Sequence, residues 1–199
     1  LQGSNAFSRV YHKTLPEVQF SLLWYDNNWD FNTLGAIYED AADQSIYDAF
    51  KHQIAAPLGM EDYQVSDGRY VTGSDSLHPA YTFVMSTRDL ARFGLLFLRH
   101  GRWRDQSVVP RAWVEESPQA HSSTTYRNDV AGYGYMWWVG TIGAERVYSA
   151  LGFGGHPIYI LPGLDLVVVH RVDTFGRTRV RGFEKRQLLG LIIEARPQS

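Results

Sequence analysis

Residues 86–101 constrain the fold of this chain most, because they carry every local signal of one amphipathic helix. Ser86 is a good N-cap, since its hydroxyl can accept a hydrogen bond from an N–H that the first helical turn leaves unpaired. Asp89 follows in the first turn, where the helix dipole favours negative charge. Apolar side chains recur at helical spacing, at Leu90, Phe93, Leu96 and Phe97. Gly101 is a natural stop residue, so the sequence predicts a helix that ends just before it.

Helical spacing prevails in the first part of the chain, about residues 20–132, which we expect to be mainly helical. The predicted helices cover residues 30–42, 45–56, 87–100 and 110–116. Side chains expected to face the core are Leu34, Ile37 and Tyr38 in the first helix, and Ile46, Ala49, Phe50 and Ile54 in the second. Residues 61–85 contain Gly68, Gly73 and Pro79, so we expect them to be rich in loops.

The period changes to that of β-strands in the second part, residues 133–199. The predicted strands cover residues 133–139, 145–150, 158–161 and 164–170, and Pro162-Gly163 forms the turn of a β-hairpin. An amphipathic helix is predicted over residues 180–195, with the apolar side chains Leu188, Leu189, Leu191, Ile192 and Ile193. This order predicts an α+β fold, in which a helical subdomain is followed by an antiparallel sheet that a C-terminal helix covers.

Composition excludes several classes of partner and chemistry. A net charge of -2 gives no electrostatic reason to expect nucleic acid or an anionic membrane as a partner, and the absence of cysteine excludes disulfides and thiolate chemistry. No apolar run approaches the roughly 20 residues that span a bilayer. Six Trp and twelve Tyr suit an apolar cleft, although an aromatic core is the plainer explanation. The N-terminus lacks Met and a signal-peptide pattern, so we expect a tag remnant, a processed end or the edge of a fragment there.

Two further segments could carry chemistry. Residues 24–35 begin with the aromatic and amide-rich segment Trp24-Tyr-Asp-Asn-Asn-Trp and continue into a helix. Asn and Asp favour a turn at such a place, because their side chains bond the local backbone. A helix start with Trp24 and Trp29 packed in the core explains the same pattern. Residues 148–156, Tyr-Ser-Ala-Leu-Gly-Phe-Gly-Gly-His, predict a strand that ends in a glycine-rich turn, where a ligand could approach the backbone closely. A plain turn at the edge of a sheet is the alternative.

Residues 24–35, 86–101 and 148–156 resemble segments of the serine β-lactamase-like hydrolases and occur in the same order as in that family. That superfamily contains penicillin-binding proteins, class C β-lactamases and related esterases and amide hydrolases. This sequence most resembles the esterase and 6-aminohexanoate-oligomer-hydrolase branch. The resemblance covers about residues 20–195, which correspond to the C-terminal part of a longer domain. It therefore implies an incomplete β-lactamase/transpeptidase-like fold, with residues 1–199 forming one partial domain.

In the resembled family, a Tyr-x-Asn or Tyr-x-Ser motif precedes the first of these helices. The phenol acts as or assists the general base, with its pKa lowered by a nearby Lys, and the amide orients the substrate. Counting back from Leu34-Gly35 places Asp26 and Asn28 at the two motif positions, whereas a shift by one residue pairs Tyr25 with Asn27. The predicted residues of this segment are Tyr25, Asp26 and Asn28 as catalytic residues and Trp24 as a substrate contact.

The family's Lys-Thr-Gly strand edge, or its His-x-Gly or Ser-Gly variants, lies along the substrate cleft. Its backbone contributes one N–H to the oxyanion hole, which stabilises the negative oxygen that develops in acyl transfer. Here Ala150-Leu151-Gly152 occupies that place, and the missing Lys and hydroxyl argue against carboxylate-bearing β-lactams as preferred substrates. The resemblance implies substrate contacts at Gly152, Gly154 and His156, although a surface turn is an alternative place for the histidine.

The family's nucleophile, the Ser of a Ser-x-x-Lys motif, has no counterpart in this sequence. In that motif one helical turn places the ammonium beside the hydroxyl and helps to deprotonate it. The residues three positions before Lys13, Lys51 and Lys185 are Val10, Asp48 and Gly182. We therefore expect the nucleophilic Ser and its Lys to lie on polypeptide outside this sequence, and this chain alone to be inactive.

The resemblance implies hydrolysis of a small-molecule ester or amide through an acyl-enzyme, with no metal or cofactor. The seven histidines lack zinc-ligand spacing, which agrees with that expectation. A missing N-terminal segment of the same protein is an expected partner, and nucleic acid and a membrane span are not expected. The alternative is a catalytically inactive homologue or fragment that binds a ligand or partner, which Asp26 at the tyrosine position favours.

Overall fold

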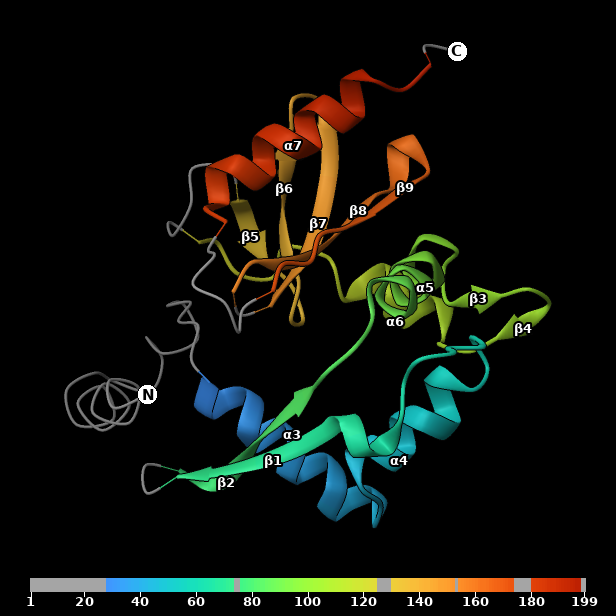
Figure 1. Cartoon of the computed structure of the whole chain (residues 1–199), viewed down its shortest axis with the longest axis vertical. Helices are drawn as coiled ribbons and strands as arrows, with labels where there is room; N and C mark the ends of the chain where they lie inside the picture. The colour runs from blue at the N-terminus through green and yellow to red at the C-terminus, as the bar shows by residue number, and fades with distance from the viewer. Residues whose placement is uncertain (1–27, 74–75, 125–129, 153, 174–179, 198–199) are drawn as a thin grey trace. The chain divides into compact units, whose positions relative to one another are not determined.

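The computed structural model describes residues 28–73, 76–124, 130–152, 154–173 and 180–197. They divide between two compact units, Leu1–Ser86 and Thr87–Ser199, and each unit is described by itself (Figure 1). The mixture of helices with antiparallel strands confirms the predicted α+β class.

Unit 1 consists of helices followed by a β-hairpin. Its elements are α3 (Asn28–Ala42), α4 (Ile46–Phe50), a π-helical turn (Lys51–Ala55), a 3-10 turn (Val65–Asp67), β1 (Gly68–Gly73) and β2 (Ser76–Phe83). Strands β1 and β2 pair antiparallel, so the expectation of loops over residues 61–85 was wrong. Pro79 in sequence favours a loop, but a two-stranded sheet leaves one side of each strand unpaired and tolerates a residue without an N–H.

Helix α3 begins close to the predicted position, but it packs through another face than expected. It lies on β2 at Gly35, where an added Cβ would come within 2.3 Å of the Tyr81 ring. Leu34 and Ile37, which were predicted to face inward, are 51% and 58% exposed, so that part of the prediction was wrong. The glycine permits the closest approach of helix and strand, and the bulkier apolar side chains are left outside.

An aromatic cluster forms the core of unit 1. Ser45 caps α4 by accepting from the Tyr47 N–H, and the buried Tyr47 ring meets the rings of Tyr70 and Phe83 edge to face at 4.9 and 5.0 Å. Its hydroxyl accepts from the Thr82 N–H at 3.1 Å, which ties α4 to β2. Part of the high aromatic content is thus explained by core packing.

Unit 2 is a five-stranded antiparallel sheet between helices (Figure 1). Its strands are β5 (Val130–Tyr133), β6 (Trp138–Ile142), β7 (Glu145–Gly152), β8 (His156–Leu161) and β9 (Leu166–Val169), in that order across the sheet. Before the sheet come α5 (Thr87–Leu98), a small hairpin of β3 (Arg102–Trp103) and β4 (Gln106–Ser107), and α6 (Arg111–Glu116). After it comes α7 (Gly182–Glu194), and a 3-10 turn (Pro162–Leu164) joins β8 to β9.

The two faces of this sheet carry separate cores. On one face Phe97 and Leu98 of α5 pack with Val114 of α6 against inward side chains of the sheet such as Tyr148 and Ile160. On the other face Leu189 of α7 packs on side chains such as Val147, Tyr159 and Leu161. Alternate residues along β7 and β8 point to opposite helices, as the pleat requires.

Helix α5 confirms the strongest sequence signal. Leu96 is fully buried and Phe97 is nearly so, and Gly101 adopts a φ of +80° while its N–H donates to the Leu96 carbonyl at 2.8 Å. Asp89 lies in the first turn as expected, but it is buried and forms an ion pair with Arg92 at 2.8 Å.

Other predicted boundaries in unit 2 need correction. The single strand expected over residues 133–139 is two strands, because a tight turn carries the chain from β5 into β6, with Met136 at a φ of +66°. The predicted hairpin around Pro162-Gly163 is confirmed. In α7 the apolar Leu188 and Leu191 are 43% and 63% exposed, and Leu189 is its one buried residue. A helix that is apolar on several sides cannot bury all of them against one sheet.

Candidate functional site

The glycine-rich end of β7 forms a tight, closed turn with the start of β8. Gly152 pairs with His156 across the two strands, and the Gly155 N–H donates to the Gly152 carbonyl at 3.3 Å. Gly154 and Gly155 adopt φ angles of +77° and +94°, which favour glycine over residues with a side chain. The glycines are therefore needed for this backbone path, whatever else they do.

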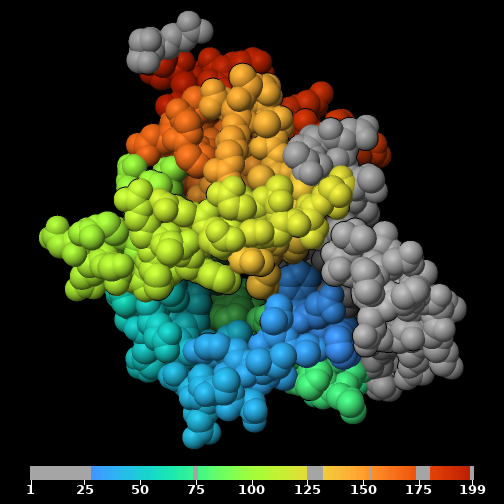
Figure 2. Space-filling model, turned by 180° about the vertical axis from the view of Figure 1, so that it is seen from behind, coloured from blue at the N-terminus to red at the C-terminus, as the bar shows by residue number. Residues whose placement is uncertain are grey.

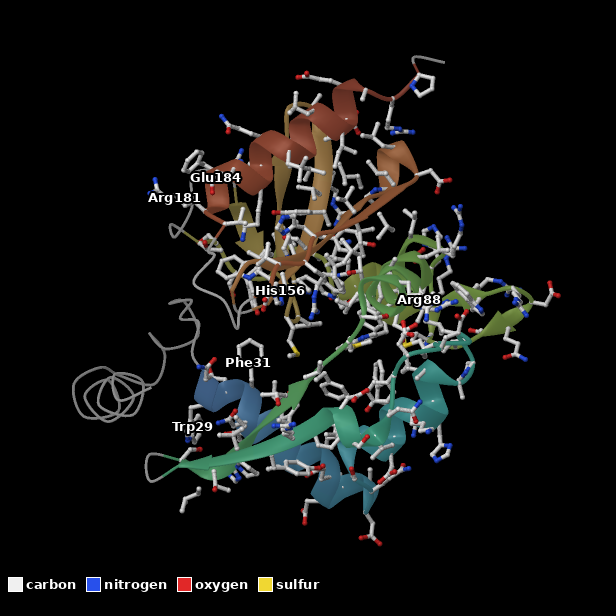
Figure 3. All side chains as sticks on the ribbon, viewed as in Figure 1. Trp29, Phe31, Arg88, His156, Arg181 and Glu184 are labelled. Carbon is white, nitrogen blue, oxygen red and sulfur yellow. The ribbon has the colours of Figure 1, made fainter. Side chains whose placement is uncertain are left out.

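Two histidines brace this turn. His156 Nε2 donates to the Val172 carbonyl at 2.9 Å, and His170 Nδ1 donates to the Gly155 carbonyl at 3.1 Å, since a carbonyl oxygen can only accept. Figure 3 labels His156 at the start of β8. Lys185 of α7 lies over the turn, so close that a Cβ on Gly155 would come within 2.9 Å of its Nζ. The turn is thus held by His170 from the segment after β9, and Lys185 of α7 lies against it.

Strand β7 extends past its neighbour β6. The pairing of these strands runs from Ile142↔Glu145 to Trp138↔Ser149, whereas the pairing of β7 with β8 continues to Gly152↔His156. In the strand pairing that the structure describes, residues 150–152 therefore have a partner on the β8 side alone. The Gly152 carbonyl faces that side, and the N–H and C=O of one residue point the same way, so those of Leu151 face the side that β6 leaves.

The side chains along this part of β7 point away from that free backbone edge. Ser149 and Leu151 face α7, where they help Gly182 and Arg186 to line a cavity of about 30 Å³. A cavity of this size has room for about one water molecule and is too small for an organic substrate. What β7 offers to a ligand at this edge is consequently its main chain.

Five tyrosines of the structure have raised pKa values, whereas a tyrosine that acts as a catalytic base needs a lowered pKa. Burial raises the pKa of Tyr148 to about 12, although Arg146, 5.7 Å from the ring centroid, opposes the shift. Desolvation also raises the pKa values of four tyrosines in unit 1, Tyr47, Tyr63, Tyr70 and Tyr81, although the Tyr70 side chain is 44% exposed and its bond to Glu39 adds to the rise. A phenolate base near neutral pH needs a lowered pKa, so these five side chains are structural.

Comparison with protein families identifies the fold to which this turn and free edge belong. Residues 9–190 match the family model for Beta-lactamase. The chain belongs to the Beta-lactamase family. The resemblance inferred from the sequence is confirmed by this match, which covers most of both units.

Solved structures show the same fold at low sequence identity. The chain is similar to a proposed 6-aminohexanoate-dimer hydrolase from Bacillus anthracis, with a TM-score of 0.65 and 22% identity over 88% of this chain and 46% of that chain. It is similar to an octameric penicillin-binding protein homologue from Pyrococcus abyssi, with a TM-score of 0.64 and 18% identity over 95% of this chain and 46% of that one. A curated but uncharacterised protein of Alkalihalophilus pseudofirmus is 23% identical over 120 residues, 55% of this chain and 36% of that protein. This β-lactamase-family chain thus spans about half the length of these two solved relatives and about a third of the length of the curated one.

The residues predicted from sequence fall in three places. Trp24, Tyr25 and Asp26 lie outside the described residues. Asn28 is the first residue of α3 in unit 1 and is exposed. The structure brings Gly152, Gly154 and His156 together in one turn of unit 2, and their roles toward a substrate stay predictions.

Sequence reasoning missed that His170 braces the glycine turn and that Lys185 lies against it. Both are distant from it along the chain, and neither lies in a motif, so pairing β8 with β9 and docking α7 are needed to find them.

Among the described residues, no three His, Asp or Glu side chains gather as a metal ion would require. No helix in the described part of the chain is long and apolar enough to cross a membrane.

Proposed function

We propose that this chain forms part of the substrate site of a serine hydrolase that cleaves an ester or amide through an acyl-enzyme. The observation that carries the proposal is the free backbone edge of β7 at residues 150–152, next to the braced glycine turn. Rigid backbone N–H groups at such an edge can donate to the oxygen that becomes negative in acyl transfer, without reorganising during the reaction. Family membership supports the same class of reaction.

The proposal assigns nucleophilic attack to a Ser, assisted by a Lys, on polypeptide outside these 199 residues, since no Ser-x-x-Lys occurs in the sequence. Tyr25 or Asp26 is the candidate base, and Asn28 is the candidate amide that orients the substrate. The raised pKa values of the buried tyrosines support placing the base outside the described cores.

We propose a neutral ester or amide as substrate. At the place of the family's Lys-Thr-Gly, Ala150 and Leu151 provide neither the ammonium nor the hydroxyl that would bind a substrate carboxylate. The likeness to a proposed 6-aminohexanoate-dimer hydrolase, whose named substrate is joined by an amide bond, supports an amide as the bond that is cleaved.

A substitution that deletes one backbone donor tests this proposal. In the full-length protein, Leu151→Pro removes an N–H that the sheet does not use, so the fold should persist while kcat/KM on p-nitrophenyl butyrate falls about 100-fold. Leu151→Ala keeps the N–H and is the matched control, with kcat/KM expected within about 3-fold of the parent. Equal activity of the two variants would show that this edge does not contact the substrate. A full-length protein that turns over no ester or amide would favour the alternative, a homologue that only binds a ligand.

A further inference from the structure

A basic hollow lies in unit 2 between the C-terminal half of α5 and the β3–β4 hairpin. It has a volume of about 450 Å³ and is lined by Leu95, Arg99, Arg102, Trp103 and Arg104. Small-molecule sites in proteins have volumes of about 300–1,000 Å³. Figure 2 shows the yellow-green segment that contains this hairpin projecting from the surface. The hollow faces the turn between β8 and β9, so it lies at the end of β8 opposite the glycine turn.

One of the three arginines is held in place by a carboxylate. Arg99 makes two hydrogen bonds to Asp165, at 2.5 and 3.0 Å, and this pairing lowers the pKa of Asp165, so the pair is formed at neutral pH. Its bidentate geometry fixes the Arg99 guanidinium as one wall of the hollow.

The other two arginines keep their positive charge available. Arg102 donates to a main-chain oxygen, that of Asp105, at 3.4 Å. The described residues give the Arg104 guanidinium no hydrogen-bond or ion-pair partner. Glu115 pairs instead with Arg111 at 2.6 Å and with His100 at 3.3 Å. Arg102 and Arg104 thus both line the hollow, and the described contacts pair neither guanidinium with a carboxylate side chain.

The backbone of Arg104 gives a second, independent observation. The pairing Trp103↔Gln106 makes residues 104 and 105 a two-residue hairpin loop, and Arg104 has a φ of +51°. Glycine is favoured at such a position because any Cβ crowds its own backbone there, and Asn or Asp is tolerated because its side chain bonds the local backbone. The turn itself therefore does not require an arginine at this position.

Apolar groups complete the lining. Trp103 is half-buried and Leu95 comes from the adjacent turn of α5, so they offer a flat apolar wall beside the guanidinium groups. An aromatic ring can stack on Trp, and the paired negative charges of an oxyanion suit the planar donors of Arg.

We propose that this hollow binds a small organic dianion that carries an aromatic ring, with a phosphate monoester as the matching class. The two unpaired guanidinium groups balance the charge of the phosphate, and Trp103 stacks on the ring. This site is independent of the proposed hydrolase activity, because it uses none of the residues of the β7 edge.

Titration calorimetry of the protein with phenyl phosphate tests the proposal. We expect saturable binding that Arg104→Gly weakens about tenfold, the loss typical of one charge-assisted hydrogen bond. Arg104→Gly relieves the positive φ, so its unfolding midpoint should not fall and a loss of binding cannot be ascribed to misfolding. Arg69→Ala, which removes an equal charge from the exposed face of β1, is the matched control and should bind phenyl phosphate as the parent does.

Two further ligands separate the parts of the proposal. Inorganic phosphate lacks the ring and benzoate lacks the second charge, so each should bind at least about tenfold more weakly than phenyl phosphate. Affinity for inorganic phosphate equal to that for phenyl phosphate would overturn the role of Trp103, and equal affinity for benzoate would overturn the dianion. No saturation by about 10 mM phenyl phosphate, or equal losses in Arg104→Gly and Arg69→Ala, would overturn the site itself.

Discussion

Helices α5 and α7 cover opposite faces of one sheet, but they are fixed to it in different ways. Helix α5, with 12 residues, buries five of them, among them Leu96 and Phe97. Helix α7, with 13 residues, buries Leu189 alone and leaves Phe183, Leu188 and Leu191 about half exposed or more. The comparison teaches that similar apolar content gives unequal anchoring when the apolar side chains of one helix are spread around its axis.

The glycines of the two helices show the same difference. In α5 an added Cβ at Gly94 would lie 2.6 Å from Val167 and 3.1 Å from Ile158, so the helix backbone lies directly on β8 and β9. In α7 an added Cβ at Gly190 would meet nothing within 4 Å. Helix α5 is in close contact with the sheet at Gly94, whereas α7 has open space at Gly190.

The largest expected difference concerns leucine truncation. Leu96→Ala in α5 should lower the free energy of unfolding by about 2–5 kcal/mol, because it opens a cavity under a fully buried side chain. Leu191→Ala in α7 should change it by less than about 0.5 kcal/mol, since that side chain is 63% exposed. Urea denaturation of both variants measures the two values. Similar losses would mean that the comparison of the helices is wrong.

Alkaline pH should weaken the α5-side core next. The folded state raises the pKa of Tyr148 from its ordinary value near 10 to about 12, so its neutral form is favoured by folding. The stability from this group is complete below about pH 10 and is lost as pH rises toward 12, to a total of about 2–3 kcal/mol.

Tyr148→Phe removes this titrating group and is the direct check on that loss. Unfolding midpoints from pH 9 to 11.5 should fall less steeply in the variant than in the parent. Parallel pH profiles for the two proteins would show that the titration of Tyr148 does not cause the loss of stability at alkaline pH.

Alanine in place of the two glycines should have effects of opposite sign. Gly94→Ala forces α5 away from the sheet and should destabilise by about 1–3 kcal/mol, despite the higher helix propensity of Ala. Gly190→Ala meets no neighbour and should stabilise by about 0.5–1 kcal/mol. Thermal denaturation reports both signs. A stabilising Gly94→Ala would mean that α5 lies farther from β9 than described.

The smallest effect is expected at the start of α7. Glu184 accepts from the Arg181 N–H at 2.6 Å, which forms half of a capping box at the start of α7; Figure 3 labels both residues. Glu184→Ala should cost about 0.5–1 kcal/mol, whereas Glu194→Ala at the other end removes no such bond and serves as the control. A larger loss at Glu194 than at Glu184, measured by urea denaturation, would exclude the capping role.

The same contrast explains which parts of the fold could be predicted from sequence. Helix α5 has one apolar face, a capping residue and a stop glycine, so local signals agree with the tertiary structure. The hairpin of β8 and β9 was predicted for the same reason, since Pro162-Gly163 separates two β-branched runs. Local pattern failed for α3, where the contact is made by Gly35, and for α7, where apolar residues lie on several faces.

The candidate site was predictable only where it is continuous in sequence. Gly152, Gly154 and His156 lie within one turn, and the glycines alone indicate its unusual backbone. The free edge at Leu151 could not be predicted, because it depends on where β6 begins relative to β7. That register follows from the turn between β5 and β6, which the predicted single strand over residues 133–139 had missed.

The central claim is that these residues form part of an acyl-transfer site whose nucleophile lies on other polypeptide. Labelling the full-length protein with a fluorophosphonate, followed by mass spectrometry of the labelled peptide, tests it most directly. We expect the label on a Ser outside these 199 residues and no labelling of this chain alone. A label on any serine of this chain would contradict the claim.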